Sequence, residues 1–158
     1  MTARLTGIAR RAQPRAAMET LSAGTVSVAA GLEGDFRGKN GHRQVTVIFA
    51  QDWEAACHVL GQDLAWTTRR ANLLVEGLSG LEGIKVLGAR LRVGPVLLEV
   101  TEETEPCSRM DAQAQGLREA LKPDWRGGIC CKVLEGGTIA LGAGVTIEAD
   151  AGATRMSA

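Results

Sequence analysis

Glycine divides this chain into short segments, and this limits the folds that it can adopt. The chain has 20 glycines among its 158 residues. Glycine weakens a helix interior but suits tight turns between strands. Only 3% of the residues are aromatic, so a core must be built mainly from Val, Leu, Ile and Ala. The sequence therefore predicts a mainly β fold and argues against a helical bundle.

Short apolar and β-branched runs mark the expected strands. They cover residues 4–10, 25–30, 44–49, 73–75, 89–93, 96–101, 129–134, 138–140 and 144–148. Gly136-Gly137 lies between two of these runs, and this pair favours a hairpin turn. Residues 31–41 hold four glycines and predict a long loop whose main-chain amides can approach a ligand closely. We expect a β-barrel or sandwich that carries helical insertions.

Two segments have helical periodicity instead. Residues 52–60 form the first, with Asp52 as a plausible N-cap and Gly61 at the stop position. Its apolar stripe consists of Trp53, Ala56, Cys57 and Leu60. Residues 109–121 form the second, which Pro123 ends. We therefore expect two short helices beside the strands.

Charge and hydropathy exclude several classes of protein. The net charge is zero, with an excess of basic residues before position 44 and of acidic residues after it. A neutral total gives no case for bulk nucleic-acid binding, although a local basic cluster can still hold a small anion. No apolar run approaches the roughly 18 residues of a membrane helix. We expect one soluble cytoplasmic domain over residues 1–150, no membrane association, and a frayed tail at residues 151–158.

The cysteines are predicted to be reduced thiols. No C-x-x-C pair occurs, so a structural zinc site is not indicated. Cys57 lies on the apolar stripe of the first helix, where a core residue is the better interpretation. Cys130 and Cys131 are neighbours in a strand, so one is expected in the core and the other on the opposite face. A redox role for this pair stays open as the weaker alternative.

Cys107 is the cysteine outside any predicted helix or strand. Ser108 and Asp111 form a capping-box pattern that predicts Ser108 as the N-cap of the second helix. Unpaired amides at a helix start, together with Arg109, favour the thiolate form of Cys107. A thiolate is both a nucleophile and a soft metal ligand. The alternative, a small residue in a loop, stays open on residue types alone.

Basic residues adjoin the glycine-rich loop and a later strand. Arg37 and Arg43 lie on one side, and Arg69 and Arg70 on the other, with Asn72 close by. Guanidinium groups suit phosphate, and glycine-rich main chain can add amide donors. An ordinary solvated surface is the alternative. No Walker sequence and no G-x-G-x-x-G occurs, so a nucleotide-binding fold is not indicated.

The order of these motifs resembles that of the MOSC domain family, named for the C-terminal domain of molybdenum cofactor sulfurases. The motifs are Gly31-Leu32-Glu33-Gly34-Asp35, Arg43-Gln44-Val45-Thr46-Val47-Ile48, Arg69-Arg70-Ala71-Asn72-Leu73-Leu74-Val75-Glu76-Gly77, Leu98-Glu99-Val100-Thr101, Glu105-Pro106-Cys107 and Val133-Leu134-Glu135-Gly136-Gly137. The resemblance covers about residues 4–148. It implies a mainly β, barrel-like MOSC fold with two short helices, which binds the molybdenum cofactor (molybdopterin).

The resemblance also implies roles for single residues. Cys107 would be the molybdenum thiolate ligand and the catalytic residue. Arg69, Arg70 and Asn72 would meet the pterin or its phosphate, and Asp35, Arg37 and Arg43 would line the opposite wall. Arg37 stands where the family often has His, and Ala71 lengthens the Arg-Arg-Asn run.

Three hypotheses about function follow. The first is an enzyme that reduces N-hydroxylated compounds with the cofactor and receives electrons from a separate donor protein. The second is a carrier of the cofactor, or of sulfur as a Cys107 persulfide supplied by a sulfur-donor protein. The third is a barrel that binds neither.

Overall fold

The computed structural model describes residues 2–39 and 41–148, so the predicted tail at 151–158 lies outside the described residues. The strands are β1 (Ala3–Arg10), β2 (Glu19–Leu21), β3 (Ala23–Ser27), β4 (Gly31–Leu32), β5 (Val45–Phe49), β6 (Leu73–Glu76), β7 (Arg90–Val93), β8 (Val96–Glu103), β9 (Ile129–Glu135), β10 (Gly137–Ala140) and β11 (Gly144–Glu148). Every predicted strand segment overlaps one of these strands. The sequence interpretation missed β2 and β4, which are short.

Seven strands close into a barrel, which confirms the predicted fold class. They follow the order β11-β7-β8-β9-β5-β6-β1, and a pairing of β1 with β11 closes the ring. β2 pairs with the end of β1 beyond the ring, and β10, β3 and β4 form a separate small sheet. The barrel strands are antiparallel except for β5 and β6, which are parallel. Because a parallel pair needs a long crossover, the chain leaves the barrel between β5 and β6.

The barrel interior is filled by aliphatic side chains with few aromatics. Along β5, Val45, Val47 and Phe49 point into the main core, whereas Ile48 belongs to a second apolar cluster outside the barrel. This alternation follows from the two-residue period of a strand. Thr46 shares the outer face with Ile48 and is also buried. β5 is therefore covered on both faces.

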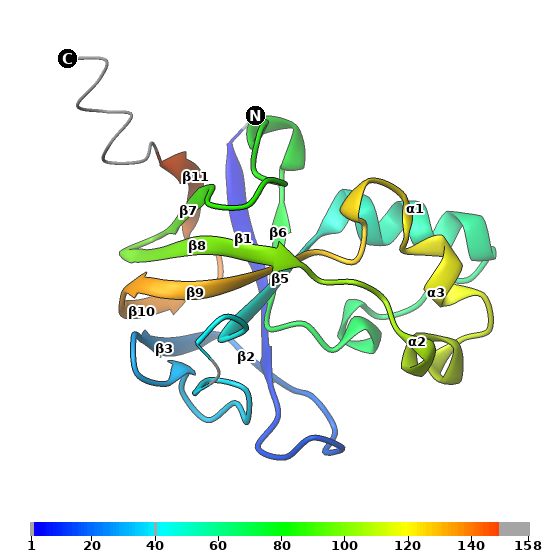
Figure 1. The fold of residues 1–158 in the computed structure, drawn as a ribbon, viewed down its shortest axis with the longest axis horizontal. Helices are drawn as coiled ribbons and strands as arrows, with labels where there is room; N and C mark the ends of the chain where they lie inside the picture. Colours follow the sequence, from blue (N-terminus) through cyan, green and yellow to red (C-terminus); the bar gives the residue numbers. More distant parts are fainter. Residues whose placement is uncertain (1, 40, 149–158) are drawn as a thin grey trace.

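The helices lie together on one side of the barrel (Figure 1). They are α1 (Ala50–Leu60), α2 (Ser108–Gln113) and α3 (Leu117–Ala120). Trp53, Ala56, Leu117 and Leu121 pack with Ile48 in the second cluster. The 3-10 turns η1 (Trp66–Arg69), η2 (Leu78–Gly80) and η3 (Pro123–Trp125) complete the helical segments. This layer of helices covers the outer faces of β5 and β6.

The first helix begins two residues earlier than predicted. Phe49 occupies the N-cap position without a side-chain hydrogen bond, and Asp52 lies inside the first turn. Asp52 is buried and forms an ion pair of 2.8 Å with Lys85 Nζ. The predicted end is confirmed: Gly61 has φ 67° and donates to the main-chain oxygens of Cys57 and His58. Asp52 therefore pairs with a distant side chain and does not cap α1.

The single helix predicted over residues 109–121 is wrong, because the structure has two short helices there. Ala114 is extended, with φ −157°, and Gly116 has φ 89°. The predicted Ser108 cap is also wrong: Cys107 is the N-cap, and no side chain caps the helix. The Asp111 carboxylate accepts from the Arg118 amide, 3.1 Å away. Gly116, in the left-handed region, thus interrupts the helix. The apolar periodicity of the sequence alone cannot reveal this interruption.

The hairpin predicted at Gly136-Gly137 is wrong as well. β10 follows β9 directly but pairs with β3, in the other sheet. A Cβ at Gly136 would lie 2.5 Å from the Val26 main-chain oxygen, so the chain crosses from one sheet to the other where only glycine fits. By contrast, β7 and β8, which Gly94-Pro95 separates, form an antiparallel hairpin.

Candidate functional site

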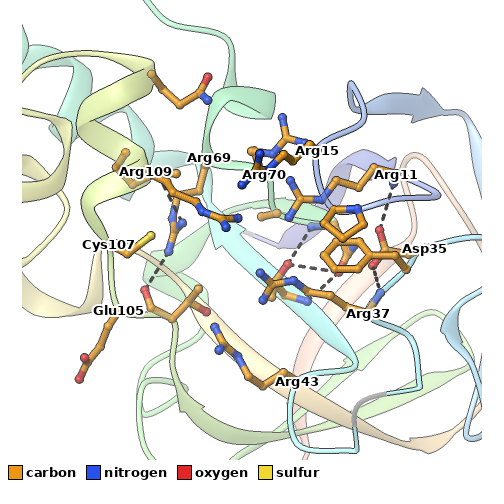
Figure 2. A pocket seen from close by; sticks show the side chains of 18 of the residues that line it. Arg11, Arg15, Asp35, Arg37, Arg43, Arg69, Arg70, Glu105, Cys107 and Arg109 are labelled. Atoms are coloured by element: carbon orange, nitrogen blue, oxygen red, sulfur yellow. Dashed lines mark hydrogen bonds between the residues drawn. The ribbon is translucent and has the colours of Figure 1, made fainter.

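A pocket of about 370 Å³ lies outside the barrel, beside the outer face of β5. Its walls come from the segment after β1, the segment after β4, the end of η1 and the segment between β8 and α2 (Figure 2). It is lined by Arg11, Pro14, Arg15, Asp35, Phe36, Arg37, Arg43, Thr46, Arg69, Arg70, Ala71, Asn72, Thr104, Glu105, Cys107, Arg109, Met110, Ala112 and Gln113. The structure therefore brings all seven residues proposed from the sequence to one cavity.

Cys107 lies on one wall of the pocket, where the chain passes from β8 to α2. The residue is exposed and forms no disulfide. Its main-chain oxygen accepts the Met110 amide at 2.9 Å, which starts the helix turn. α2 spans only six residues, so the helix-dipole contribution expected from a long second helix is reduced. The thiol is accessible from the pocket.

Arg69 is buried below the pocket and joins three segments. Nε donates to the Gly127 oxygen at 3.0 Å, and Nη2 donates to the Thr104 oxygen at 2.9 Å. Nη1 lies 3.6 Å from Met110 Sδ. Burial lowers the pKa of Arg69 to about 10, so the side chain is charged at neutral pH. Arg69 therefore contacts Thr104, which precedes Cys107, and Met110, which follows it.

Asn72 also uses its side chain inside the protein. Its Oδ1 accepts the Thr46 amide at 3.0 Å and the Thr46 hydroxyl at 3.2 Å. Its Nδ2 donates to the Ala9 oxygen at 3.2 Å. Asn72 therefore ties the start of β6 to β5 and β1 at the floor of the pocket.

Asp35, on the opposite wall of the pocket, also forms hydrogen bonds within the protein. Oδ1 accepts the Arg11 amide at 3.1 Å, and Oδ2 accepts the Arg37 amide at 3.2 Å. The Phe36 amide in turn donates to the Arg11 oxygen at 2.9 Å. The carboxylate thus joins the end of β1 to the segment after β4 and fixes two arginines at the pocket wall.

Two guanidinium groups flank the ring of Phe36. That of Arg11 lies 4.7 Å from the ring centroid, and that of Arg37 lies 5.3 Å from it. Burial lowers the pKa of both arginines, and nearby arginines lower it further. For Arg11 the pKa falls to about 10. The aromatic face partly stabilises cations that burial and mutual repulsion disfavour.

Arg70 leaves the η1 turn in a different direction from Arg69. Its φ of 66° lies in the left-handed region, which is uncommon for a residue other than glycine. Its Nη2 donates to the Ala16 main-chain oxygen in the segment after β1. Figure 2 shows Arg69 beside Cys107 and Arg70 beside Arg15. Arg69 and Arg70 are consecutive in the sequence but therefore contact different parts of the site.

Arg43 lies between an acidic residue and a buried thiol. Its Nε lies 3.1 Å from Glu102 Oε1. Burial alone would lower the pKa of Arg43, but Cys130, Glu102 and Cys107 together raise it. Cys130 is completely buried on the outer face of the barrel, and its Sγ lies 3.1 Å from Thr104 Oγ1.

The predicted opposite orientation of Cys130 and Cys131 is confirmed. Cys131 belongs to the barrel core, and burial raises the pKa of its thiol. Cys130 points to the other face but is covered there by the segment that leads to Cys107. The two cysteines are unpaired. They therefore have separate environments.

The pocket is strongly cationic, with seven arginines and two carboxylates in its lining. The sequence interpretation did not include Arg11, Arg15 or Phe36 in the site, and it used Arg109 only as a charge beside Cys107. The excess of basic residues before position 44 was the signal for Arg11 and Arg15. Their spatial relation to Arg70 depends on how β1 and β6 pair in the barrel.

The motif order, the barrel and the pocket agree with the match to a known family. The MOSC domain family model matches residues 23–146. This chain belongs to the MOSC domain family. No curated protein sequence matched this MOSC domain.

Several solved structures share the fold of this MOSC domain. The YUAD protein from Bacillus subtilis has a TM-score of 0.78 and 16% identity, over 92% of this chain and 94% of that one. YiiM from Geobacillus stearothermophilus has a TM-score of 0.73 and 17% identity, over 93% and 75%. YiiM from Escherichia coli has 0.70 and 15%, over 93% and 70%. At these identities the comparisons establish the fold.

None of the helices in the described part of the chain is long and apolar enough to cross a membrane. Within residues 2–39 and 41–148, no three His, Cys, Asp or Glu side chains are grouped to hold a metal ion. Cys107 is the cysteine in the lining of this pocket.

Proposed function

We propose that this MOSC domain binds the molybdenum cofactor in the arginine-rich pocket and reduces N-hydroxylated compounds. The observation that carries the proposal is the presence of one exposed thiol, Cys107, in the wall of a cavity with a large excess of arginines. The cofactor combines a metal with a phosphate tail. A soft thiolate and several guanidinium groups are the protein groups that suit these two parts.

The residues of the pocket fit this ligand in two ways. Arg37, Arg43 and Arg70 are only partly buried and would bind the cofactor by charge and hydrogen bonding. Asp35, Arg69 and Asn72 would hold the walls, since their hydrogen bonds run largely to main-chain groups. Cys107 would be the protein ligand of molybdenum. This division refines the expectation that all six polar residues touch the cofactor.

The bound cofactor would supply oxygen-atom transfer and two-electron chemistry at molybdenum. The protein would orient the cofactor and keep its anionic groups neutralised. The substrate would be a small molecule, because the pocket of about 370 Å³ also has to hold the cofactor. Electrons would come from a separate donor protein, since the sequence carries no flavin, haem or iron–sulfur motif. We place this activity in the cytoplasm, where the four unpaired thiols would stay reduced.

The exposure of Cys107 supports a second candidate function. An accessible thiol can carry sulfur as a persulfide received from a sulfur-donor protein. A carrier of this kind, or a protein that stores the cofactor, would need the same pocket but would not turn over substrate.

Elemental analysis of freshly purified protein, expressed with adequate molybdate, tests the proposal. We expect molybdenum and phosphorus in equal amounts and reduction of an N-hydroxylated base with a chemical electron donor. Molybdenum without reduction would favour the carrier, and a sulfane-sulfur assay of Cys107 would identify a persulfide. Protein free of molybdenum under these conditions would refute cofactor binding.

A further inference from the structure

Two consecutive residues between α3 and β9 adopt an uncommon main-chain conformation. Asp124 has φ 50° and Trp125 has φ 56°, so both lie in the left-handed region although neither is glycine. Residues other than glycine seldom adopt this conformation, and they keep it only where the surrounding structure fixes it. The Trp125 side chain packs against the barrel core. The main chain of this left-handed turn needs further contacts that hold it in place.

A lysine from a distant loop holds the main-chain oxygen of Asp124. Lys85 Nζ donates to this oxygen at 2.6 Å and forms an ion pair with Asp52 Oδ2 at 2.8 Å. Lys85 directly follows Ile84, which is 1% exposed and belongs to the main core, so its main chain is fixed to the barrel. The Lys85 side chain thus joins the barrel to the start of α1 and to the left-handed turn.

The turn supplies partners for the oxygens on either side of that of Asp124. These two oxygens accept the amides of Arg126 and Gly128, at 2.9 and 3.0 Å. Lys85, 39 positions earlier in the sequence, donates to the oxygen between them. The conformation of the turn therefore depends on this side chain.

The turn leads directly into two glycines that hold the segment before Cys107. The Gly127 oxygen accepts Arg69 Nε at 3.0 Å, and the Gly128 oxygen accepts the Thr104 amide at 2.9 Å. A Cβ at Gly127 would lie 2.3 Å from the Thr104 oxygen, so only glycine lets the two segments approach this closely. A shift of the turn would therefore move the partners of Arg69 and Thr104 together.

The charge of Lys85 also acts on the end of β8. Burial and the nearby Glu105 carboxylate raise the pKa of Glu103, and the Lys85 ammonium opposes this increase. Glu103 is the last residue of β8 and directly precedes Thr104. Lys85 therefore interacts with the segment before Cys107 in two ways: by charge with Glu103, and by hydrogen bonding through the left-handed turn.

We infer that Lys85 is a positioning residue for Cys107, which acts through the turn at Asp124 and the glycines that follow it. Lys85 is absent from the pocket lining, so it would touch neither cofactor nor substrate. The inference rests on the proposed function only for the role of Cys107 as the functional thiol. The hydrogen bonds between Lys85 and the segment before Cys107 are present without a ligand and can be tested separately.

Hydrogen exchange of single amides in the full chain, followed by NMR, tests this connection. Lys85→Met removes the ammonium group and keeps most of the aliphatic side chain. We expect the Thr104 amide, which donates to Gly128, to exchange about tenfold faster or more, because a charge-assisted hydrogen bond to the turn is lost. An unchanged exchange rate of the Thr104 amide would overturn the inference.

Two variants serve as controls. Lys122→Met removes the same charge close to the turn, but Lys122 Nζ binds the Glu119 carboxylate at 2.6 Å, so wild-type exchange of the Thr104 amide is expected. Val145→Ala leaves a cavity in the barrel core and lowers stability without touching the turn. It is expected to accelerate Thr104 exchange less than Lys85→Met does. A Thr104 exchange rate in Lys85→Met that matches either control would overturn the inference.

Rescue by a conservative variant separates positioning from a loss of packing. Lys85→Arg keeps the charge and the donors, and is expected to return the Thr104 exchange rate close to that of the wild type. An exchange rate in Lys85→Arg as fast as in Lys85→Met would overturn the inference. If Lys85→Met does not fold, Lys85→Gln takes its place in every comparison.

The consequence for Cys107 is measured in protein expressed with adequate molybdate. Lys85→Met is expected to retain less molybdenum than Lys122→Met, and Lys85→Arg is expected to recover the loss. Equal retention in Lys85→Met and Lys122→Met would overturn the positioning of Cys107. Wild-type protein that never takes up molybdenum would refute the proposed function, and faster Thr104 exchange in Lys85→Met would then still support the connection through the turn.

Discussion

Nη2 of Arg69 donates a hydrogen bond to the main-chain oxygen of Thr104 across a distance of 2.9 Å. Thr104 directly follows β8 and lies three positions before Cys107. Because Arg69 also binds the Gly127 oxygen, it holds the strand that leads to the thiol against the segment that leads into β9. The position of Cys107 therefore depends on a buried arginine far from it in the sequence.

Arg69→Gln is expected to destabilise the protein more than Arg70→Gln does. The shorter side chain leaves buried main-chain oxygens without donors, at a cost of about 1–3 kcal/mol each. Arg70 is only partly buried and donates to one main-chain oxygen. Urea unfolding of both variants checks this difference. Equal midpoints would show that the Arg69 contacts contribute no more to folding than those of Arg70.

Ser108→Ala is expected to leave stability nearly unchanged, within about 0.5 kcal/mol. The usual cost of losing an N-cap, about 1 kcal/mol, does not apply, because Ser108 is the first residue of α2 and caps nothing. Thermal melts of the variant and the wild type measure the effect. A loss of 1 kcal/mol or more, as estimated for an N-cap, would mean that the capping box forms in solution.

Asp52 makes the free energy of unfolding depend on pH. Burial raises the pKa of Asp52 above 3.8, and the Lys85 ammonium only partly opposes this. A carboxyl group with a raised pKa in the folded state favours folding when protonated. This contribution to stability is complete below the pKa of Asp52 in the unfolded state and is lost as the pH rises through its pKa in the folded state.

Asp52→Asn should therefore gain stability relative to the wild type as the pH rises from about 4 to neutrality. Urea unfolding of both proteins across this range gives the difference at each pH. A difference that does not change with pH would contradict the raised pKa. A difference in the opposite direction would show that the ion pair with Lys85 outweighs the cost of burial.

Cys107→Ser is expected to abolish molybdenum retention and reductase activity while the melting temperature stays unchanged. The residue is exposed, so the substitution leaves no cavity, and a serine hydroxyl is a poor soft donor. Cys57→Ala is the control, since Cys57 packs against the second apolar cluster. It should lower the free energy of unfolding by about 1 kcal/mol and spare the chemistry.

Metal content, activity and melts of the four single cysteine variants check this pair of outcomes. Full activity in Cys107→Ser would refute the site. Activity lost only on substitution of the buried Cys130, whose Sγ lies 3.1 Å from Thr104 Oγ1, would move the site to that buried thiol.

The local elements of this protein could be predicted from the sequence because they depend on near neighbours. The run Val45–Phe49 is β-branched and aromatic, and Gly61 ends α1. The placement of Cys107 outside a strand or helix interior was readable for the same reason. The motif order identified the family, and with it a set of residues that the structure brings to one pocket.

The tertiary structure alone decided which groups meet. β1 closes the barrel against β11, and β10 leaves β9 for β3, because pairing depends on segments far apart in the chain. The same long-range packing buries Arg69 among main-chain oxygens and places the Arg11 guanidinium 4.7 Å from the centroid of the Phe36 ring. Both arginines look alike in the sequence. Burial and geometry, which no local pattern encodes, make Arg69 a structural residue that joins two segments and place Arg11 at the wall of the pocket.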